Sequence, residues 1–117
     1  MPQPPTVVVN PVNHTCTPDQ VHITQAHGRG VAIFFVIDPS AAGDWSWSQS
    51  PDPVVLDNAG GIFSDGKHPG SGRGKDRVRV LNRNLPSDVG AHKYTANLVQ
   101  DSTGARVAID PHIINEL

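Results

Sequence analysis

The feature that most constrains the fold is a predicted β-hairpin near the C-terminal end of the sequence. Its first strand alternates, with Tyr94, Ala96 and Leu98 separated by polar side chains, so one face of that strand is predicted to be buried. The tetrapeptide Asp-Ser-Thr-Gly at 101–104 supplies residues that favour a tight turn. A second strand is predicted over Arg106–Ile109. The chain is therefore expected to close with an antiparallel pair of strands.

The composition extends this prediction to the whole chain. Eleven Pro and eleven Gly divide the 117 residues into short segments, and Glu116 is the only Glu among eleven acidic residues. Turn formers are abundant and strong helix formers are scarce, which favours many short strands over helices. The length predicts a single domain over 1–117 with its own hydrophobic core, beginning with an extended Pro-rich lead-in at 1–5.

The spacing of the apolar segments predicts an all-β fold, an antiparallel sandwich of about seven to nine strands. Val31–Ile37 is apolar at every position, which predicts a central strand covered on both faces. Trp45 and Trp47 share one face of a strand, and we expect them to fill the core rather than form an exposed platform for a sugar or peptide. The predicted strands, with a last extended piece, are Thr6–Asn10, Gln20–Thr24, Val31–Ile37, Asp44–Ser48, Val54–Leu56, Arg77–Leu81, Lys93–Gln100, Arg106–Ile109 and Ile113–Asn115.

The order of the predicted core positions resembles that of immunoglobulin-like domains over roughly residues 20–110. Those domains place a core residue on strand B, a tryptophan on strand C and a corner tyrosine two positions before a core residue on strand F. The residues that follow this order are Ile33, Trp45 or Trp47, and Tyr94 with Ala96. Ile33 and Ala96 depart from the family by standing where many members keep a disulfide. The resemblance implies an immunoglobulin-like topology, and a cupredoxin-like sandwich is the alternative.

A second resemblance concerns the C-terminal residues 109–117. This segment is similar to the tail of the small bacterial DP-EP family, which has no established function, although Leu117 stands where a proline is expected. The resemblance implies a bacterial source and no particular chemistry.

Charge is distributed unevenly along a chain whose net charge is −2. Residues 67–83, the basic segment, carry six cations against one acid, while the rest of the chain carries three cations against ten acids. The strand within this segment is predicted to attract an acidic protein partner, another copy of the chain or anions, and the alternative is a solvated face. The negative net charge and the lack of aromatic residues between the arginines argue against nucleic acid. The candidate binding residues are Arg73, Lys75, Arg77, Arg79 and Arg83.

Histidine and cysteine chemistry indicates no cofactor. Six histidines are scattered without a His-x-His or His-x₃-His pair, and the weak metal candidates are His68, His92 and His112. Blue copper is not predicted, because Cys16 lies early and Met1 is the only methionine. No motif for a hydrolytic nucleophile occurs, so the chain is not expected to be an enzyme. With one cysteine, no visible signal peptide and no membrane span, a cytoplasmic location is expected.

A long Gly-rich loop is predicted at 57–76. It is interpreted as a mobile surface loop, with a binding loop as the alternative. Its segment Pro69–Lys75 resembles a phosphate-binding loop only superficially, because Asp76 follows the lysine where that motif requires Ser or Thr and then a helix.

Together these features predict a non-catalytic β-sandwich module that acts by protein association, as a homo-oligomer or an accessory subunit. The alternative is a module that binds a small ligand or a metal ion through His and Asp residues on loops.

Overall fold

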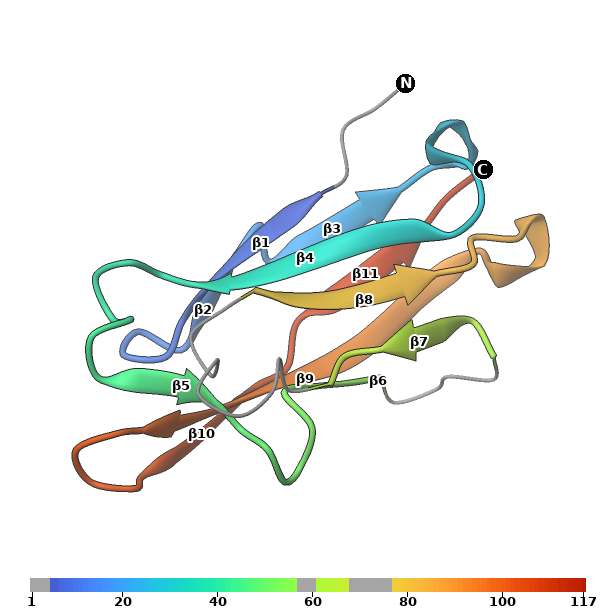
Figure 1. Cartoon of the computed structure of the whole chain (residues 1–117). Helices are drawn as coiled ribbons and strands as arrows, with labels where there is room; N and C mark the ends of the chain where they lie inside the picture. Colours follow the sequence, from blue (N-terminus) through green and yellow to red (C-terminus); the bar gives the residue numbers. More distant parts are fainter. Residues whose placement is uncertain (1–4, 57–60, 68–76) are drawn as a thin grey trace.

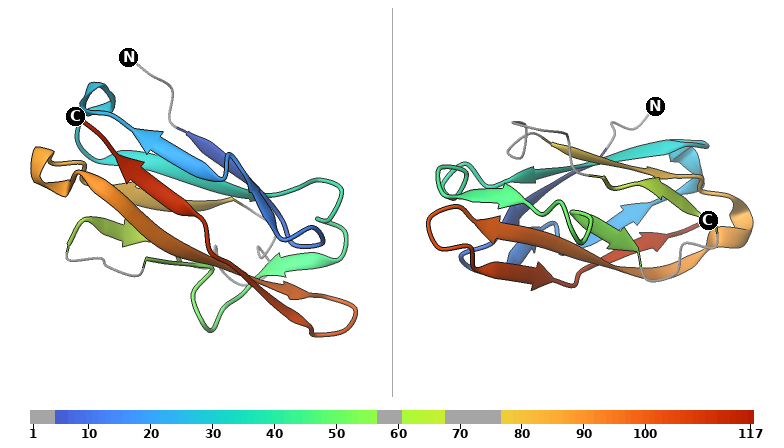
Figure 2. Two further views of the ribbon diagram at one scale, coloured as in Figure 1. Left: turned by 180° about the vertical axis from the view of Figure 1, so that it is seen from behind. Right: turned by 60° about the horizontal axis from the view of Figure 1, so that its bottom comes forward.

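The computed structural model describes residues 5–56, 61–67 and 77–117, and these residues form two β-sheets packed as a sandwich (Figure 1). They contain eleven strands and two 3₁₀ helices, η1 (Gln25–His27) and η2 (Pro86–Asp88). Figure 2 shows the sheets as two layers lying face to face. No helix in this described part of the chain has both the length and the apolar character needed to cross a membrane.

The first layer is a five-stranded sheet with β4 at its centre. Its order is β2-β1-β4-β8-β7, and only the β1–β4 pair is parallel among its described pairings. The strands are β1 (Thr6–Asn10), β2 (Thr15–Thr17), β4 (Val31–Ile37), β7 (Phe63–Asp65) and β8 (Val78–Asn82).

The second layer is organised around β9 (Gly90–Gln100), which pairs with strands along both of its edges. At Ala96, for example, β9 pairs with Val54 on one side and with Ile109 on the other. Strand β3 joins the sheet through a parallel pairing with β11. The remaining strands are β3 (Gln20–Ile23), β5 (Trp45–Trp47), β6 (Val54–Leu56), β10 (Arg106–Ile109) and β11 (His112–Asn115).

Most of the predicted strands are confirmed. The strands β1, β4, β6 and β10 have the predicted bounds, and β3, β5, β8, β9 and β11 agree to within three residues. Strands β2 and β7 were not predicted. Since β7 lies inside 57–76, the expectation of a long loop without regular structure is wrong at residues 63–65.

The sheets are mixed, so the expectation of a wholly antiparallel sandwich is wrong at two pairs. The strand β1 runs parallel to β4, and β11 runs parallel to β3. Parallel neighbours cannot be joined by a hairpin turn. After β1 and before β4, the chain passes through β3, which belongs to the other sheet. The strands β3 and β11 are separated by most of the sequence.

The core lies between the two layers and contains both tryptophans. Trp45 and Trp47 are 7% and 2% exposed, which confirms their predicted place in the core. Phe35 of the five-stranded sheet contacts Tyr94 of the other sheet edge to face, with ring centroids 5.1 Å apart. The inward-facing side chains of β4, which are buried, are Val31, Ile33, Phe35 and Ile37.

The outer face of β4 differs from the prediction. Ala32, Phe34 and Val36 are only half-buried, so this strand is not fully covered on both faces. The alternation of fully and partly buried residues arises because successive side chains of a strand point to opposite sides. The five-stranded sheet therefore presents an apolar stripe on its outer side.

Candidate functional site

Arg77 and Arg79 lie on the outer side of the five-stranded sheet, beside this apolar stripe. Val78 and Val80 are buried in the sandwich, so the exposed arginines on either side of Val78 point outward. Arg79 stands directly opposite Phe34 on β4. Cross-strand neighbours of this kind share one face of the sheet. The structure thus brings together two of the five predicted binding residues with an aromatic ring.

The guanidinium of Arg77 stacks on Phe34. Its Cζ atom lies 4.1 Å from the ring centroid, which is a cation–π contact. Arg77 has no carboxylate partner among the described residues. The contact fixes the position of the arginine and leaves its charge available to an acidic group.

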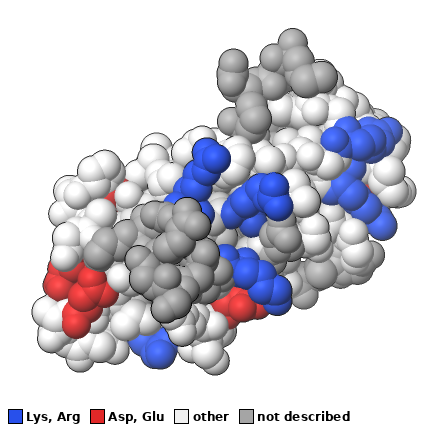
Figure 3. All heavy atoms as spheres, viewed as in Figure 1, with Lys and Arg blue, Asp and Glu red and all other residues white. Residues whose placement is uncertain are grey.

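Half-buried apolar side chains continue the surface around Phe34. Val8 pairs with Val36, and Ala32 pairs with Leu81, all on the outer side of the sheet. Figure 3 shows several Lys and Arg side chains on this side of the molecule, over β8. We call the set the outer patch, and its residues are Val8, Ala32, Phe34, Val36, Leu81, Arg77 and Arg79.

Two further described cations of the basic segment, Lys67 and Arg83, pair with carboxylates. Lys67 Nζ lies 3.4 Å from Asp52 Oδ2 in an exposed ion pair. Arg83 follows the C-terminal end of β8 and donates from Nε and Nη2 to the two carboxylate oxygens of Asp88, both at 3.0 Å. Arg83 therefore has a structural contact with Asp88 and is not counted in the outer patch. The predicted binding residues Arg73 and Lys75 lie outside the described residues.

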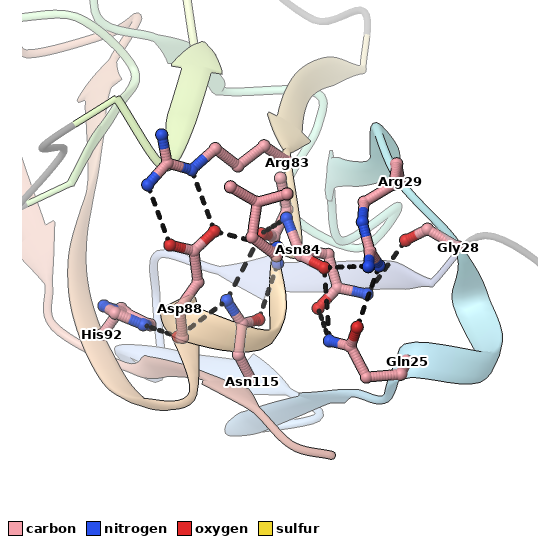
Figure 4. A network of polar contacts seen from close by, with 10 residues as sticks. Gln25, Gly28, Arg29, Arg83, Asn84, Asp88, His92 and Asn115 are labelled. Carbon is pink, nitrogen blue, oxygen red and sulfur yellow. Dashed lines mark hydrogen bonds and ion pairs between the residues drawn. The ribbon is translucent and has the colours of Figure 1, made fainter.

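The Arg83–Asp88 pair belongs to a buried polar network at one end of the sandwich (Figure 4). The hydrogen bonds from Arg83 lower the pKa of the Asp88 carboxyl, and the backbone N–H of Leu85 adds to this effect. Asn82 on β8 and Asn115 on β11 exchange amide hydrogen bonds between the sheets. The network, which we call the end network, consists of Asn82, Asn84, Asp88 and Asn115, all buried, with Arg83, Gln25 and Arg29 at its rim.

Asn84 connects the end network to η1. It has a positive φ of 55°, and its Nδ2 donates to the carbonyl oxygens of Thr24 and Gly28 at 2.9 and 3.0 Å. Asparagine tolerates this left-handed conformation better than most residues. The loop that precedes β4 is thereby held to the end of β8.

The predicted metal candidates do not come together in the described structure. His92 points inward, where Nε2 lies 2.8 Å from the carbonyl oxygen of Asp88 and the ring contacts Phe63 edge to face. His112 pairs with Lys93 on the outer face of the same sheet. Within the described ranges, no three His, Cys, Asp or Glu side chains are arranged to hold a metal ion. His68 lies outside these ranges.

Cys16 is buried on β2 near Tyr94. Burial raises the pKa of its thiol to about 11, although the neighbouring Tyr94 hydroxyl acts in the opposite direction. Burial also raises the pKa of Tyr94. No hydrogen bond of normal geometry reaches Tyr94 Oη from the described residues. The thiolate is the nucleophilic form of cysteine, so this thiol is unreactive near neutral pH.

Two sequence comparisons identify no family and no relative for this chain. No protein-family model matches the chain, and no curated protein sequence matches it.

The sequence predicted part of this site. It identified Arg77 and Arg79, but Phe34 was assigned to a doubly covered strand and was not recognised as their neighbour. The end network was also missed. Its signal is present in the sequence, because Asn82 and Asn115 occupy inward positions in the alternating patterns of Val78-x-Val80-x-Asn82 and Ile113-x-Asn115.

Proposed function

We propose that this chain is a non-catalytic β-sandwich module that binds a protein partner through the outer patch. The observation that carries the proposal is the cation–π contact of Arg77 with half-buried Phe34. Arg79 lies directly opposite Phe34 on the neighbouring strand. The partner is either another copy of the chain or the protein to which this chain serves as an accessory subunit. The immunoglobulin-like topology and the cytoplasmic location expected from the sequence are part of the same proposal.

The composition of the outer patch supports an interface. Aromatic residues and arginine are enriched where proteins contact each other, and they supply much of the binding energy. A guanidinium already packed on a ring loses less side-chain freedom when a partner binds, which favours association. Half-buried Val36 and Leu81 beside the arginines add apolar area that a partner can cover.

The surroundings of the thiol, carboxylate and imidazole groups that could act in catalysis support a non-catalytic role. The Cys16 thiol is buried with a raised pKa. Asp88 is held by Arg83, and the side chains of His92 and His112 lie on opposite faces of one sheet. In the described residues these groups hold the fold together and do not converge on a common point.

Site-specific photo-crosslinking tests the proposal. A photoreactive amino acid is placed at Ser64, which is exposed and pairs with Leu81 at the border of the outer patch. A matched position is Val55, which is 39% exposed on the six-stranded sheet. Irradiation of cells that produce the chain should give a discrete protein adduct from position 64 and none from position 55. Adducts at neither position, or the same adducts at both, would contradict the proposed function.

A further inference from the structure

We infer that the partner presents an extended acidic segment with carboxylates at alternate positions, followed by an apolar residue. The inference rests on the proposed function and adds the chemistry of the partner. The outward side chains of β8 and of the residue before it alternate with buried ones. Arg77 and Arg79 are exposed and Leu81 is half-buried, whereas the residues between them face the core.

The spacing of these side chains matches an extended partner. Alternate residues of a strand are separated by about 6.6 Å, because the rise is about 3.3 Å per residue. A second extended segment laid along β8 has the same repeat. Two carboxylates at alternate positions would therefore reach Arg77 and Arg79 together, and an apolar side chain two residues further on would cover Leu81.

The surface beside the arginines favours a polypeptide over a free anion. Phe34 pairs with Arg79, and Ala32 pairs with Leu81, so an apolar stripe of β4 runs next to the three outward residues. A strand that is apolar at every position is typical of sheets covered on both sides. A small anion would pair with the charges but would leave this stripe exposed, whereas a polypeptide segment covers both.

Charge argues against two identical outer patches facing each other. A two-fold symmetric contact places the same surface on both sides, so Arg77 and Arg79 would oppose their own copies. Like charges facing each other across an interface disfavour association. Nucleic acid is also disfavoured, because single strands are held by bases stacking on aromatic rings and here Arg77 covers Phe34.

Three labelled peptides of identical composition test the inference by fluorescence anisotropy. The first is Thr-Glu-Thr-Glu-Thr-Leu-Thr, with alternate carboxylates. The second, Thr-Thr-Glu-Glu-Thr-Leu-Thr, places them side by side, and the third, Glu-Thr-Thr-Thr-Glu-Leu-Thr, places them four residues apart, as on one face of a helix. We expect the first peptide to bind at low salt about fivefold more tightly than either isomer. Its affinity should fall as sodium chloride is added.

Two charge-reversal variants locate the binding surface. The double variant Arg77→Glu/Arg79→Glu should lose the preference for the first peptide. The matched variant Lys93→Glu/Arg106→Glu makes the same change in net charge on exposed residues of the six-stranded sheet and should keep it. A third variant, Arg77→Gln/Arg79→Gln, removes the charges without reversing them and should also lose it. Thermal melting of each variant checks that the fold is retained.

Several results would overturn the inference. These are equal binding of the three isomers, preference for the isomer with helical spacing, tighter binding of single-stranded DNA of equal charge, or binding that survives Arg77→Glu/Arg79→Glu. The crosslinking experiment separates this failure from failure of the proposed function. A discrete adduct at position 64 without the peptide preference would refute the acidic segment and leave the proposed function standing. An adduct in which the outer patches of two copies of this chain are joined would also refute the acidic segment only.

Discussion

The side-chain amides of Asn82 and Asn115 bond to each other between the two sheets, with Asn82 Nδ2 2.7 Å from Asn115 Oδ1. The return bond, from Asn115 Nδ2 to Asn82 Oδ1, is 3.3 Å long. Both residues are at most 1% exposed. A polar pair of this kind aligns the sheets, because sliding one layer over the other would leave buried amides without partners.

Replacing Asn82 with alanine should destabilise the protein by about 1–3 kcal/mol, because it leaves the amide of Asn115 buried without its partner. The backbone N–H of Asn84 also loses its acceptor, Asn82 Oδ1. Urea unfolding measures the change. Asn13→Ala, at an exposed turn, is the control and should change stability by less than about 0.5 kcal/mol. Equal stability of the two variants would show that the buried amide pair contributes nothing.

Replacing Asp88 with asparagine should lower the free energy of unfolding at pH 7 and make it less dependent on pH in the acid range. The folded-state pKa of Asp88 is lowered, chiefly by its hydrogen bonds from Arg83, so its contribution is present above the unfolded-state pKa of about 3.9. That contribution is lost as the pH falls below about 4 toward the lower folded-state pKa. The stability difference between wild type and Asp88→Asn should therefore shrink between pH 6 and pH 3, measured by denaturant unfolding at each pH.

The exposed Asp19 supplies the comparison for this prediction. Asp19→Asn removes the same charge from an exposed position and should change the stability at pH 7 by less than about 0.5 kcal/mol. A wild type and an Asp88→Asn variant that lose stability in parallel on acidification would contradict the assignment of acid sensitivity to Asp88.

Cys16 should resist thiol reagents while the protein is folded. With a thiol pKa of about 11, the thiolate fraction at pH 8 falls about two orders of magnitude below that of a free cysteine. Reaction with a disulfide reagent should be correspondingly slower in buffer than in guanidinium chloride. The variant Ala26→Cys adds an exposed thiol that should react at once, so each molecule provides its own reference. Release of two equivalents at one rate from this variant would disprove the burial of Cys16.

Tyr94→Phe should leave stability unchanged or raise it. The hydroxyl is buried and neither donates nor accepts a hydrogen bond of normal geometry among the described residues, so its removal relieves a desolvation cost. A tyrosine that acts as an immunoglobulin-type corner bonds the backbone through its hydroxyl, and its loss would cost about 1 kcal/mol. Thermal melting of wild type and Tyr94→Phe distinguishes the two. A clear loss of stability would contradict the unbonded hydroxyl and favour the corner role.

The parts of the fold that were predictable have strong local signals. Val31–Ile37 is bounded by Gly30 and Asp38-Pro39, and Arg106–Ile109 follows a clear turn sequence, so hydrophobic pattern and turn residues agree. Strands β2 (Thr-Cys-Thr) and β7 (Phe-Ser-Asp) each contain a single apolar residue, which is too weak a pattern to identify a strand, whereas the equally short β5 and β6 contain two and three. The pairing of β7 also depends on a partner that lies 17 residues further along the chain, as when Ser64 pairs with Leu81.

The candidate site was predicted less completely than the fold. Arg77 and Arg79 follow from alternation alone, because each flanks an apolar residue of one strand. Phe34 could not be placed beside them, since this requires the register between β4 and β8. The parallel pairings that make the sheets mixed likewise depend on contacts between distant parts of the chain, which no local pattern encodes.

The central position of β9 sets the order in which the molecule can assemble during synthesis. Every strand of the five-stranded sheet has left the ribosome once Asn82 has emerged. In the described pairings, β5 and β6 bond only to β9, and β3 bonds only to β11. A nascent chain halted after Asn82 would thus expose the inward side chains of a completed first layer, together with three unpaired strands, to its surroundings. That stage, rather than the finished protein, is where this chain is most exposed to aggregation and to capture by chaperones.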